Sequence, residues 1–437
     1  CSTVNPSATM GSLRRPTSLP SFPKTIYKKF RHALSAGEAS RRTGRGRPRV
    51  SIMPTPANVV PIGTARPKVI EFFAGVGLAR IGLESAGFRV GWANDYEPDK
   101  HAMYEAHFRD AERGNDHIFE LGDVFKIDRS KLPRDAALAW GSSPCTDLSI
   151  AGSRGGIRAG ESNAFWGFIE ALRSLDGARP PVVVLENVVG LATSHGGDDL
   201  AAAIRAFNEL GYSIDVLAID ARRFIPQSRP RLFLVGAQNP PASSTEPNPE
   251  LRPDYLSWVF SDPTLRTHRA ELPTPPPSLT SGLDEHIEAM PVSDDRWWDE
   301  TRTGLFVSSL SPIQRERVAA LRRASGVTYR TAYRRTRKGV ATWEVRPDDI
   351  SGCLRTARGG SSKQAVVKVG NKRLQVRWMT PLEYARLMGA GDYNLTGART
   401  NQALFAFGDA VAVPAVEWLG TNYLLPLTKG LLAPMTD

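Results

Sequence analysis

The strongest constraint on the fold is an alternation of short apolar strands and helices between residues 69 and 235. An apolar run at 69–73 ends at the glycine-containing turn 74–77, and an amphipathic helix pattern follows at 78–86. Further strands are expected at 88–93, 136–140, 181–185, 212–219 and 231–235, and further helices at 199–210, 382–388 and 411–419. This alternation predicts an α/β fold with a mostly parallel, doubly wound sheet. Ligands bind beyond the carboxyl ends of such strands, where Gly75, Asp95, Cys145 and Glu186 fall.

The positive charge of the chain is concentrated in two segments. The net charge is +11, and residues 1–67 alone hold 12 Lys or Arg and one acid, Glu38. Residues 302–377 hold 18 basic and four acidic side chains, so the rest of the body is acidic. An acidic body beside a basic segment predicts a catalytic part joined to a module that binds a polyanion such as nucleic acid. Solvated arginine-rich helices are the alternative.

Several protein classes do not fit the sequence. It has no run of about 18 apolar residues and no charged-then-apolar N-terminal pattern, so we expect neither a membrane span nor secretion. Three cysteines, Cys1, Cys145 and Cys353, are too few for a disulfide scaffold or a four-cysteine zinc site, and we predict no metal. They fit a reducing cytosol, where a lone cysteine can be a nucleophile.

The N-terminal segment 1–67 is rich in Ser, Pro, Thr and Arg, and its composition predicts disorder. Residues 44–49, Gly-Arg-Gly-Arg-Pro-Arg, are similar to an AT-hook, an arm that lies in the minor groove of DNA. A plain basic tail is the alternative. The chain opens with Cys1 rather than Met, and Met53 lies just before the first strand, so we suspect that residues 1–52 include non-native sequence.

The turn that follows the first strand predicts a site for a nucleoside-containing cofactor. Gly75 and Gly77 permit a tight turn and the close approach of a ligand to the backbone. Asp95 ends the second strand about twenty residues later, where a carboxylate can bind ribose hydroxyls. The pattern does not separate NAD from S-adenosylmethionine, and a tight turn without a ligand also fits.

Three further strand ends carry side chains suited to catalysis. Cys145 follows a strand and precedes a glycine-rich stretch, as an exposed nucleophile could, although a lone cysteine is often simply buried. Glu186 follows four apolar residues, so its pKa can be raised to suit a proton donor; a capping or salt-bridged Glu is the alternative. Arg229 and Arg231 alternate and could hold an anionic or carbonyl group, unless they lie in a solvated turn.

Taken together and in order, these blocks resemble the C5-cytosine DNA methyltransferases, the family of the bacterial modification methylases. The resemblance runs from about residue 69 to 419, with a gap in the middle where that family varies. The matching blocks are 72–77, 94–95, 122–124, 143–149, 186–188, 227–231, 380–389 and 408–411.

The resemblance implies a Rossmann-like domain that uses S-adenosylmethionine as its cofactor. Phe73 would lie against the adenine, Asp95 would bind the ribose, Tyr96 would pack on the adenine and Asp123 would bind its amino group. The residues assigned to cofactor binding are Phe73, Ala74, Gly75, Gly77, Leu78, Asp95, Tyr96, Asp123, Val124, Pro144, Asn163 and Ala410.

The resemblance also implies methyl transfer to C5 of a cytosine that is flipped out of the duplex. Cys145 would add to C6, Glu186 would hydrogen-bond N3 and the amino group, and Arg231 would hold O2 with Arg229 nearby. The site must lower the pKa of Cys145 and supply donors for the charge that develops on the ring. Residues 149–163 would form the loop that closes on DNA.

The resemblance divides the chain into a tail at 1–67, a catalytic domain at 68–236, a smaller mixed target recognition domain at 237–377, and a return to the catalytic domain at 378–437. The basic segment would bind phosphates, and Arg355, Arg358 and Lys363 could reach base edges, with Ser149 also on the DNA. Contact with the DNA backbone alone is the alternative for most of these side chains. The helix near the C-terminus would pack back beside the first strand.

The sequence departs from the family at three places. Thr146 replaces the usual Gln after the cysteine, Asp409 replaces an Asn, and Ser142-Ser143 precede Pro144 where Gly-Pro or Gly-Phe is common. Asp409 is therefore not assigned to the cofactor. The nucleophile, the acid and the arginines are intact, so we expect an active enzyme.

Double-stranded DNA is the expected partner, and a restriction endonuclease can be a functional one. We expect a monomer in the bacterial cytoplasm, associated with the nucleoid. The rivals are a tRNA cytosine methyltransferase of the same fold, whose characteristic Cys-Phe-Thr tripeptide is missing here, an NAD-dependent oxidoreductase, and an inactive DNA-binding regulator.

Overall fold

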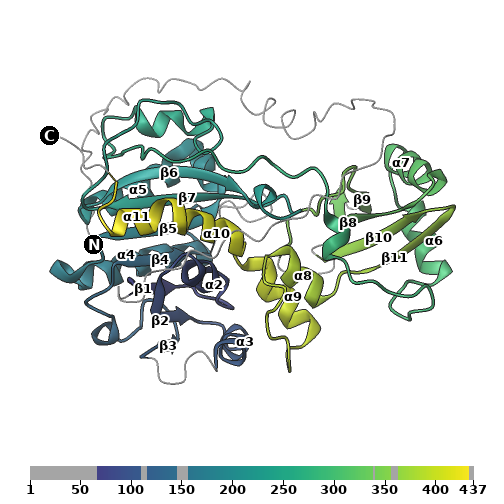
Figure 1. The fold of residues 1–437 in the computed structure, drawn as a ribbon, viewed down its shortest axis with the longest axis horizontal. Coiled ribbons are helices and arrows are strands. Elements are labelled where there is room, and N and C mark those ends of the chain that lie inside the picture. The colour runs from purple at the N-terminus through teal and green to yellow at the C-terminus, as the bar shows by residue number, and fades with distance from the viewer. Residues whose placement is uncertain (1–65, 110–115, 145–155, 338–339, 356–362, 433–437) are drawn as a thin grey trace, which may run out of the picture. The chain divides into compact units, whose positions relative to one another are not determined.

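The computed structural model describes residues 66–109, 116–144, 156–337, 340–355 and 363–432, all within one compact unit, Val60–Asp437. Its larger sheet has seven strands in the order β3-β2-β1-β4-β5-β7-β6 (Figure 1). The strands are β1 (Lys68–Phe72), β2 (Arg89–Asp95), β3 (Ile118–Leu121), β4 (Leu138–Ser142), β5 (Val182–Val188), β6 (Ser213–Asp220) and β7 (Pro230–Ala237). Residues 1–65, which make up nearly all of the predicted tail and include the AT-hook-like segment, lie outside the described residues.

Strand β7 is the one member of this sheet that runs against its neighbours. Strands β3, β2, β1, β4 and β5 pair in parallel, whereas β7 pairs antiparallel with both β5 and β6. The prediction of a mostly parallel sheet is therefore confirmed. The reversal lets the start of β7, at Arg231, pair with the end of β5, at Val188. Residues from the two strands thus meet at the edge where ligands bind in such sheets.

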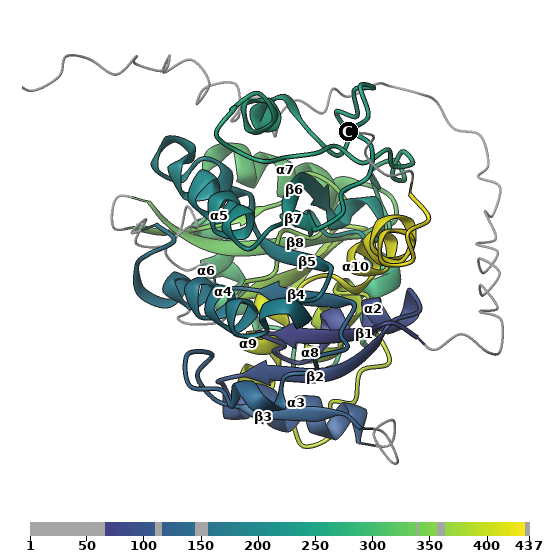
Figure 2. The same cartoon turned by 90° about the vertical axis from the view of Figure 1, so that its left-hand side faces the viewer.

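Helices cover both faces of the sheet, as a doubly wound fold requires (Figures 1 and 2). Helices α2 (Leu78–Ser85), α3 (Pro98–Phe108) and α10 (Val413–Leu419) share a core with one face, and α4 (Ala164–Ser174) and α5 (Asp198–Glu209) share a core with the other. Fully buried Trp92 and Trp140 lie within the sheet itself. Each helix buries an apolar stripe, which explains why the helical periodicity was readable in α2 and α5.

The C-terminal part of the chain returns to the large sheet. It comprises α8 (Pro381–Leu387), α9 (Thr400–Asp409), α10, a π-helical turn (Gly420–Leu424) and α11 (Leu425–Thr428). α10 packs on α2, where a Cβ at Gly82 would lie only 2.7 Å from Val416 Cβ. The helix near the C-terminus thus packs on the helix that follows β1 rather than on the strand itself. The stretch Thr400–Thr428 is long and apolar enough to cross a membrane, but its most apolar window is 67% buried inside the protein, as in a core helix.

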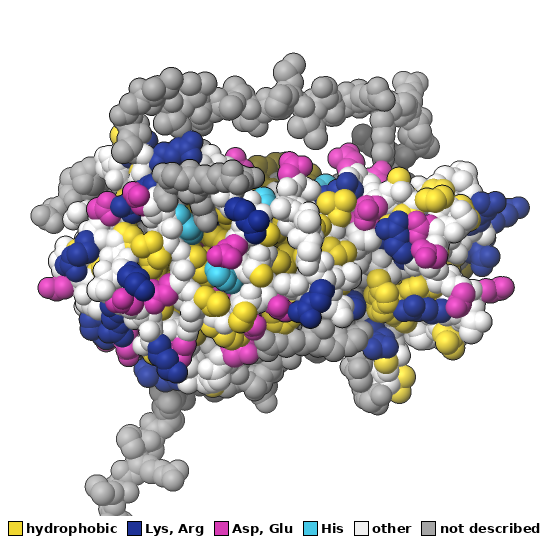
Figure 3. Space-filling view, turned by 90° about the horizontal axis from the view of Figure 1, so that it is seen from below, with side chains coloured by type: hydrophobic (Ala, Val, Ile, Leu, Met, Phe, Trp, Pro, Cys, Tyr) yellow, Lys and Arg dark blue, Asp and Glu magenta, His cyan; other side chains and the backbone are white. Residues whose placement is uncertain are grey.

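A second sheet of four antiparallel strands follows the large one in the sequence, in the order β11-β10-β8-β9. Its strands are β8 (Val327–Arg337), β9 (Val340–Val345), β10 (Gln364–Gly370) and β11 (Arg373–Trp378), and α6 (Glu300–Ser308) and α7 (Pro312–Arg323) precede them. Phe306, Trp343 and apolar residues of the strands form its own core. Lys and Arg side chains show on the surface of this part (Figure 3).

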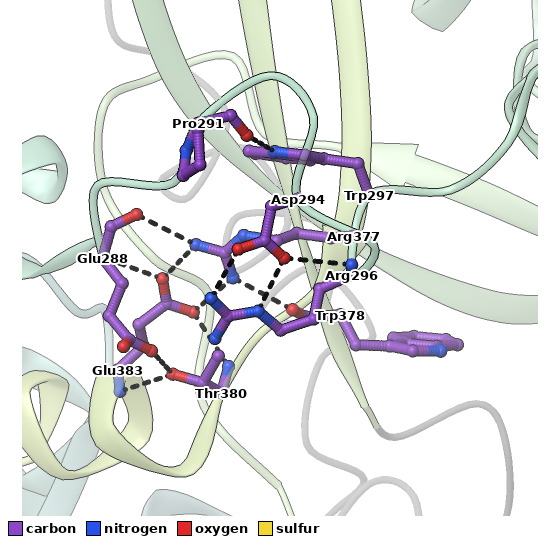
Figure 4. Close-up of polar contacts among 9 residues, drawn as sticks. All are labelled: Glu288, Pro291, Asp294, Arg296, Trp297, Arg377, Trp378, Thr380 and Glu383. Atoms are coloured by element: carbon purple, nitrogen blue, oxygen red, sulfur yellow. Dashed lines mark hydrogen bonds and ion pairs between the residues drawn. The ribbon is translucent and has the colours of Figure 1, made fainter.

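A buried ion pair ties β11 to α8 (Figure 4). Arg377 and Glu383 are both fully buried, and the Arg377 Nη1–Glu383 Oε2 distance is 2.8 Å. Glu383 also accepts from the backbone N–H groups of Thr380 at 2.8 Å and Glu288 at 2.9 Å. Breaking one partner of such a pair leaves an uncompensated buried charge. The pair therefore fixes the point at which the chain leaves the small sheet for the C-terminal helices.

The small sheet is where sequence interpretation fell short. The four strands of this sheet were not among the expected ones, and β8 alone spans Val327–Arg337. Apolar and polar residues do not alternate strictly along β8, so it carries no clear period-two signal. Helices α3, α4, α6, α7 and α9 and strand β3 were also not predicted.

A buried acid within β1 generates the first testable prediction. Glu71 is 1% exposed, neither of its carboxylate oxygens has a hydrogen-bond partner within the described part of the chain, and burial raises its pKa to about 8. Between pH 4.5 and 8 the folded protein therefore holds a proton that the unfolded chain releases, so stability falls as pH rises through this window.

We expect Glu71→Gln to flatten this dependence. Each pKa unit corresponds to about 1.4 kcal/mol, so the variant should exceed the wild type in unfolding free energy by a few kcal/mol at pH 8.5. Denaturant unfolding at pH 5, 7 and 8.5 measures it. Glu209→Gln, at an exposed carboxylate, is the control and should follow the wild type. Parallel pH profiles for wild type and Glu71→Gln would contradict the account.

Candidate active site

The turn after β1 has a backbone that few residues adopt. Phe73, Gly75 and Gly77 have φ values of 59°, 58° and 77°, in the left-handed region. A Cβ at Gly77 would lie 2.4 Å from the ring of Phe108, so a larger residue has no room there. Left-handed conformations at a non-glycine residue such as Phe73 cost energy and cluster at ligand sites. The turn thus places the half-buried Gly75 at the carboxyl end of β1, where a glycine permits a nucleotide-type cofactor to approach the backbone.

Asp95 is bonded directly to this turn. Its Oδ2 accepts from Gly75 N at 2.8 Å, and its Oδ1 accepts from Glu97 N at 2.9 Å. Burial raises the pKa of Asp95, although the charge of Lys100 and these two N–H groups act against the shift. The structure therefore brings the predicted glycine turn and the predicted ribose-binding carboxylate together.

The next strand end is held in place by Asn94. Its side-chain amide donates to Glu120 O at 2.8 Å and Gly122 O at 2.9 Å, so the end of β3 lies beside the end of β2. Asp123 follows on the surface, and its Oδ1 accepts from Phe125 N at 3.0 Å. Val124 is buried beneath it. These two predicted cofactor residues thus flank the same sheet edge as Asp95.

The other residues assigned to the cofactor differ in exposure. Leu78 and Ala74 are buried, Tyr96 is 47% exposed, and Asn163 is exposed at the N-terminus of α4. Pro144 is half-buried after β4, and Ala410 is half-buried after α9. An exposed ring at Tyr96 is free to pack on a ligand.

Glu186 and Arg231 form an ion pair at the junction of β5 and β7. The Arg231 Nε–Glu186 Oε1 distance is 3.0 Å, and the two side chains are 13% and 7% exposed. Burial raises the pKa of Glu186, although the charges of Arg231 and Arg229 act against the shift. Glu186 is thus buried at the end of an apolar strand and salt-bridged at once, and its role as a proton donor stays a prediction.

The strand that leads to Cys145 ends beside this pair. Ser142, the last residue of β4, lies opposite Glu186 in the parallel register. The Asn187 amide donates to Ser143 Oγ at 3.0 Å and Ser143 O at 3.3 Å, which fixes the start of the following segment. Cys145, Thr146 and Ser149 lie outside the described residues. The strand register thus places Ser142, three residues before Cys145, beside Glu186.

Arg229 is placed differently from what its alternation with Arg231 suggested. It is 1% exposed, and its guanidinium donates to three backbone carbonyls: Leu354 O at 2.7 Å, Gly408 O at 3.0 Å and Ala410 O. Its role toward a base stays a prediction, and its observed contacts connect three distant segments. Gln227 acts in the same way, since its Oε1 accepts from Leu354 N at 3.1 Å.

A second thiol was missed by sequence reasoning. Cys353 Sγ lies 3.3 Å from Arg229 Nη1. Burial opposes ionisation of this thiol, yet the charges of Arg229, Arg231 and Arg355 outweigh it and lower its pKa. No spacing pattern linked Cys353 to Arg229, because their contact depends on how the connection between β9 and β10 packs against the start of β7. The signal that could have found it is its closeness to Arg355 in the sequence.

The residues predicted to bind DNA are described only in part. Arg355 is exposed, and the half-buried Lys363 donates to Asn401 Oδ1 at 2.7 Å. Arg358 lies outside the described residues, as Ser149 does. Among the residues that the structure does describe, no group of three or more His, Cys, Asp or Glu side chains could hold a metal ion.

Comparisons with known proteins agree with this geometry. The family described as C-5 cytosine-specific DNA methylase matches residues 67–424. The Type II methyltransferase M.Bsp6I of Bacillus sp. (strain RFL6) is 26% identical, over 81% of this chain and 98% of that protein. The orphan methyltransferase M.SPRI of Bacillus phage SPR is 34% identical, over 39% of this chain and 37% of that protein. The chain thus spans little more than a third of this phage relative.

Among solved structures, the Dnmt2 methyltransferase of S. pombe is similar with a TM-score of 0.52 and 16% identity. The match covers 84% of this chain and 99% of that one. At this identity, the likeness concerns the fold.

The contacts of Arg229 predict its role in stability. Arg229→Met leaves three buried carbonyls without their donor, so we expect a loss of about 3 kcal/mol of unfolding free energy. Arg323→Met, at an exposed arginine of α7, should change stability by less than about 0.5 kcal/mol. Denaturant unfolding of both variants measures the difference. Equal stability of the two variants would show that Arg229 does not hold these segments together.

Proposed function

Because the chain belongs to the C-5 cytosine-specific DNA methylase family, we propose that it transfers a methyl group from S-adenosylmethionine to C5 of a cytosine in double-stranded DNA. The observation that carries the proposal is the buried Glu186–Arg231 pair beside the end of β4, which leads to Cys145. A buried acid with a raised pKa and a guanidinium are the donors that a pyrimidine ring needs as negative charge develops on it.

The cofactor turn supports S-adenosylmethionine as the cofactor. Gly75 lies half-buried in the left-handed turn, and its N–H fixes Asp95 at the edge of the turn. Phe73, Tyr96, Asp123 and Val124 would hold the adenosine part. When bound, this cofactor supplies an electrophilic methyl group.

In the proposed reaction the target cytosine leaves the base stack, because C6 cannot be attacked within it. The Cys145 thiolate forms a bond to C6, and the electrons of the 5,6 double bond make C5 nucleophilic. Glu186, protonated, donates to N3, and Arg231 donates to O2. After C5 takes the methyl group it loses its proton to a base, the Cys145–C6 bond breaks, and the double bond re-forms.

Recognition of the DNA is proposed for the small sheet and the segments around it, residues 237–377. The net positive charge of residues 302–377 fits phosphate contacts. The candidate DNA-binding residues are Arg355, Arg358 and Lys363 of this region, together with Ser149. We also propose a monomer that acts in the bacterial cytoplasm on nucleoid DNA. Similar proteins include both Type II and orphan methyltransferases. The presence or absence of a restriction endonuclease gene beside the gene for this chain would show whether it has a restriction partner.

Methyl transfer from labelled S-adenosylmethionine tests the proposal. The wild type should label double-stranded DNA of mixed sequence and not tRNA. Cys145→Ser should lose activity by about 1,000-fold or more while still binding DNA, and Glu186→Gln should lose about 100-fold. Glu209→Gln is the matched control and should retain full activity. Label on tRNA alone would favour an RNA methyltransferase, and cofactor binding without transfer would favour an inactive regulator.

The pKa of Glu186 also predicts a pH dependence. Since the protonated acid is the donor, the single-turnover rate should fall as pH rises through the raised pKa of Glu186. Glu186→Gln keeps a neutral donor at every pH, so this alkaline decline should vanish. A decline that persists unchanged in Glu186→Gln would assign it to another group.

A further inference from the structure

Asp409, where the sequence departs from its family, has an opposite charge as its partner. Lys100 of α3 lies 3.0 Å from it, measured from Nζ to Oδ2. The Lys100 side chain is 12% exposed, so most of its length is removed from water. Asp409 ends α9, more than 300 residues further along the chain. A largely buried lysine needs a compensating negative charge, and Asp409 supplies it where an Asn would not.

Lys100 also reaches the cofactor turn. Its Cδ lies 3.9 Å from the position that a Cβ would take at Gly75, so its aliphatic part covers that glycine. The charges of Asp409 and Asp95 outweigh the burial of Lys100 and raise its pKa. Asp95 is the carboxylate bonded to Gly75 N. Lys100 therefore interacts with Asp409 and with Asp95, the carboxylate bonded to the turn.

The position of Asp409 is fixed from the other side by Arg229. The carbonyls that precede and follow it, Gly408 O and Ala410 O, both accept from Arg229 Nη2. A continuous set of contacts thus runs from the arginine beside the Glu186–Arg231 pair, through Asp409 and Lys100, to the turn at Gly75.

We propose that the Lys100–Asp409 ion pair forms one wall of the cofactor pocket, with Lys100 as the positioning residue that holds the turn at Gly75 against the C-terminal block. The proposal rests on the proposed function, because the ligand is S-adenosylmethionine. Without Lys100, Asp95 and Asp409 would both lose a nearby cation, and the turn would lose the chain that packs on it. An Asn at 409 would instead remove the carboxylate with which the lysine forms its ion pair. The effects of the two residues on the turn should therefore be coupled.

A double-mutant cycle on the full chain tests the coupling. The affinity for S-adenosylhomocysteine is measured by calorimetry without DNA, so that catalysis plays no part. Lys100→Met should weaken binding about tenfold, which equals about 1.4 kcal/mol. Asp409→Asn alone should weaken it severalfold, while the double variant Lys100→Met/Asp409→Asn should return to within about threefold of the wild type. Lys100→Arg keeps the charge and should bind nearly as well as the wild type.

Lys131→Met, at a surface lysine paired with Asp128, is the control and should bind like the wild type. Thermal unfolding of each variant establishes that it is folded. Unchanged affinity in Lys100→Met, or single effects that simply add in the double variant, would overturn the ion-pair proposal while the proposed function stands. A wild-type protein that does not bind S-adenosylhomocysteine would overturn both.

Discussion

The Arg229 guanidinium makes the interaction on which the rest of the site depends. It is buried, and its donors bind the carbonyls of Leu354, Gly408 and Ala410, which lie more than 100 residues further along the chain. A buried guanidinium is tolerated where its donors are matched by acceptors, and the loss of either side leaves unpaired polar groups. One side chain thus holds the connection between β9 and β10 and the end of α9 against the start of β7.

This arrangement gives the two halves of the proposed reaction a common support. On one side of Arg229 lies the Glu186–Arg231 pair, where the base would be held. On the other side lies Asp409, whose ion pair with Lys100 reaches the cofactor turn. Methyl transfer requires the reacting carbon and the methyl donor in close contact, and misplacement by about 1 Å can cost 100-fold in rate. A shared buried anchor limits such misplacement.

Much of the catalytic half could be predicted from sequence, because its chemistry lies at the ends of apolar strands. An apolar strand precedes each of Gly75, Asp95 and Glu186 and signals its position. The register of β4 with β5 then places Glu186 beside the segment that leads to Cys145. The antiparallel direction of β7 has no local sequence signal, since the residue pattern of a strand is the same whichever way it runs in the sheet. Arg229, Lys100 and Cys353 take their roles from partners more than 100 residues away, which no local pattern encodes.

The central claim is a covalent step through Cys145, and trapping on DNA that contains 5-fluorocytosine tests it most directly. Fluorine replaces the proton that C5 must lose, so the Cys145–C6 bond cannot break after methyl transfer. The account predicts a denaturation-resistant adduct with the wild type and S-adenosylmethionine, whose mass equals protein plus DNA plus one methyl group less the thiol hydrogen, and none with Cys145→Ser. Wild-type protein that methylates ordinary DNA yet forms no such adduct would contradict it.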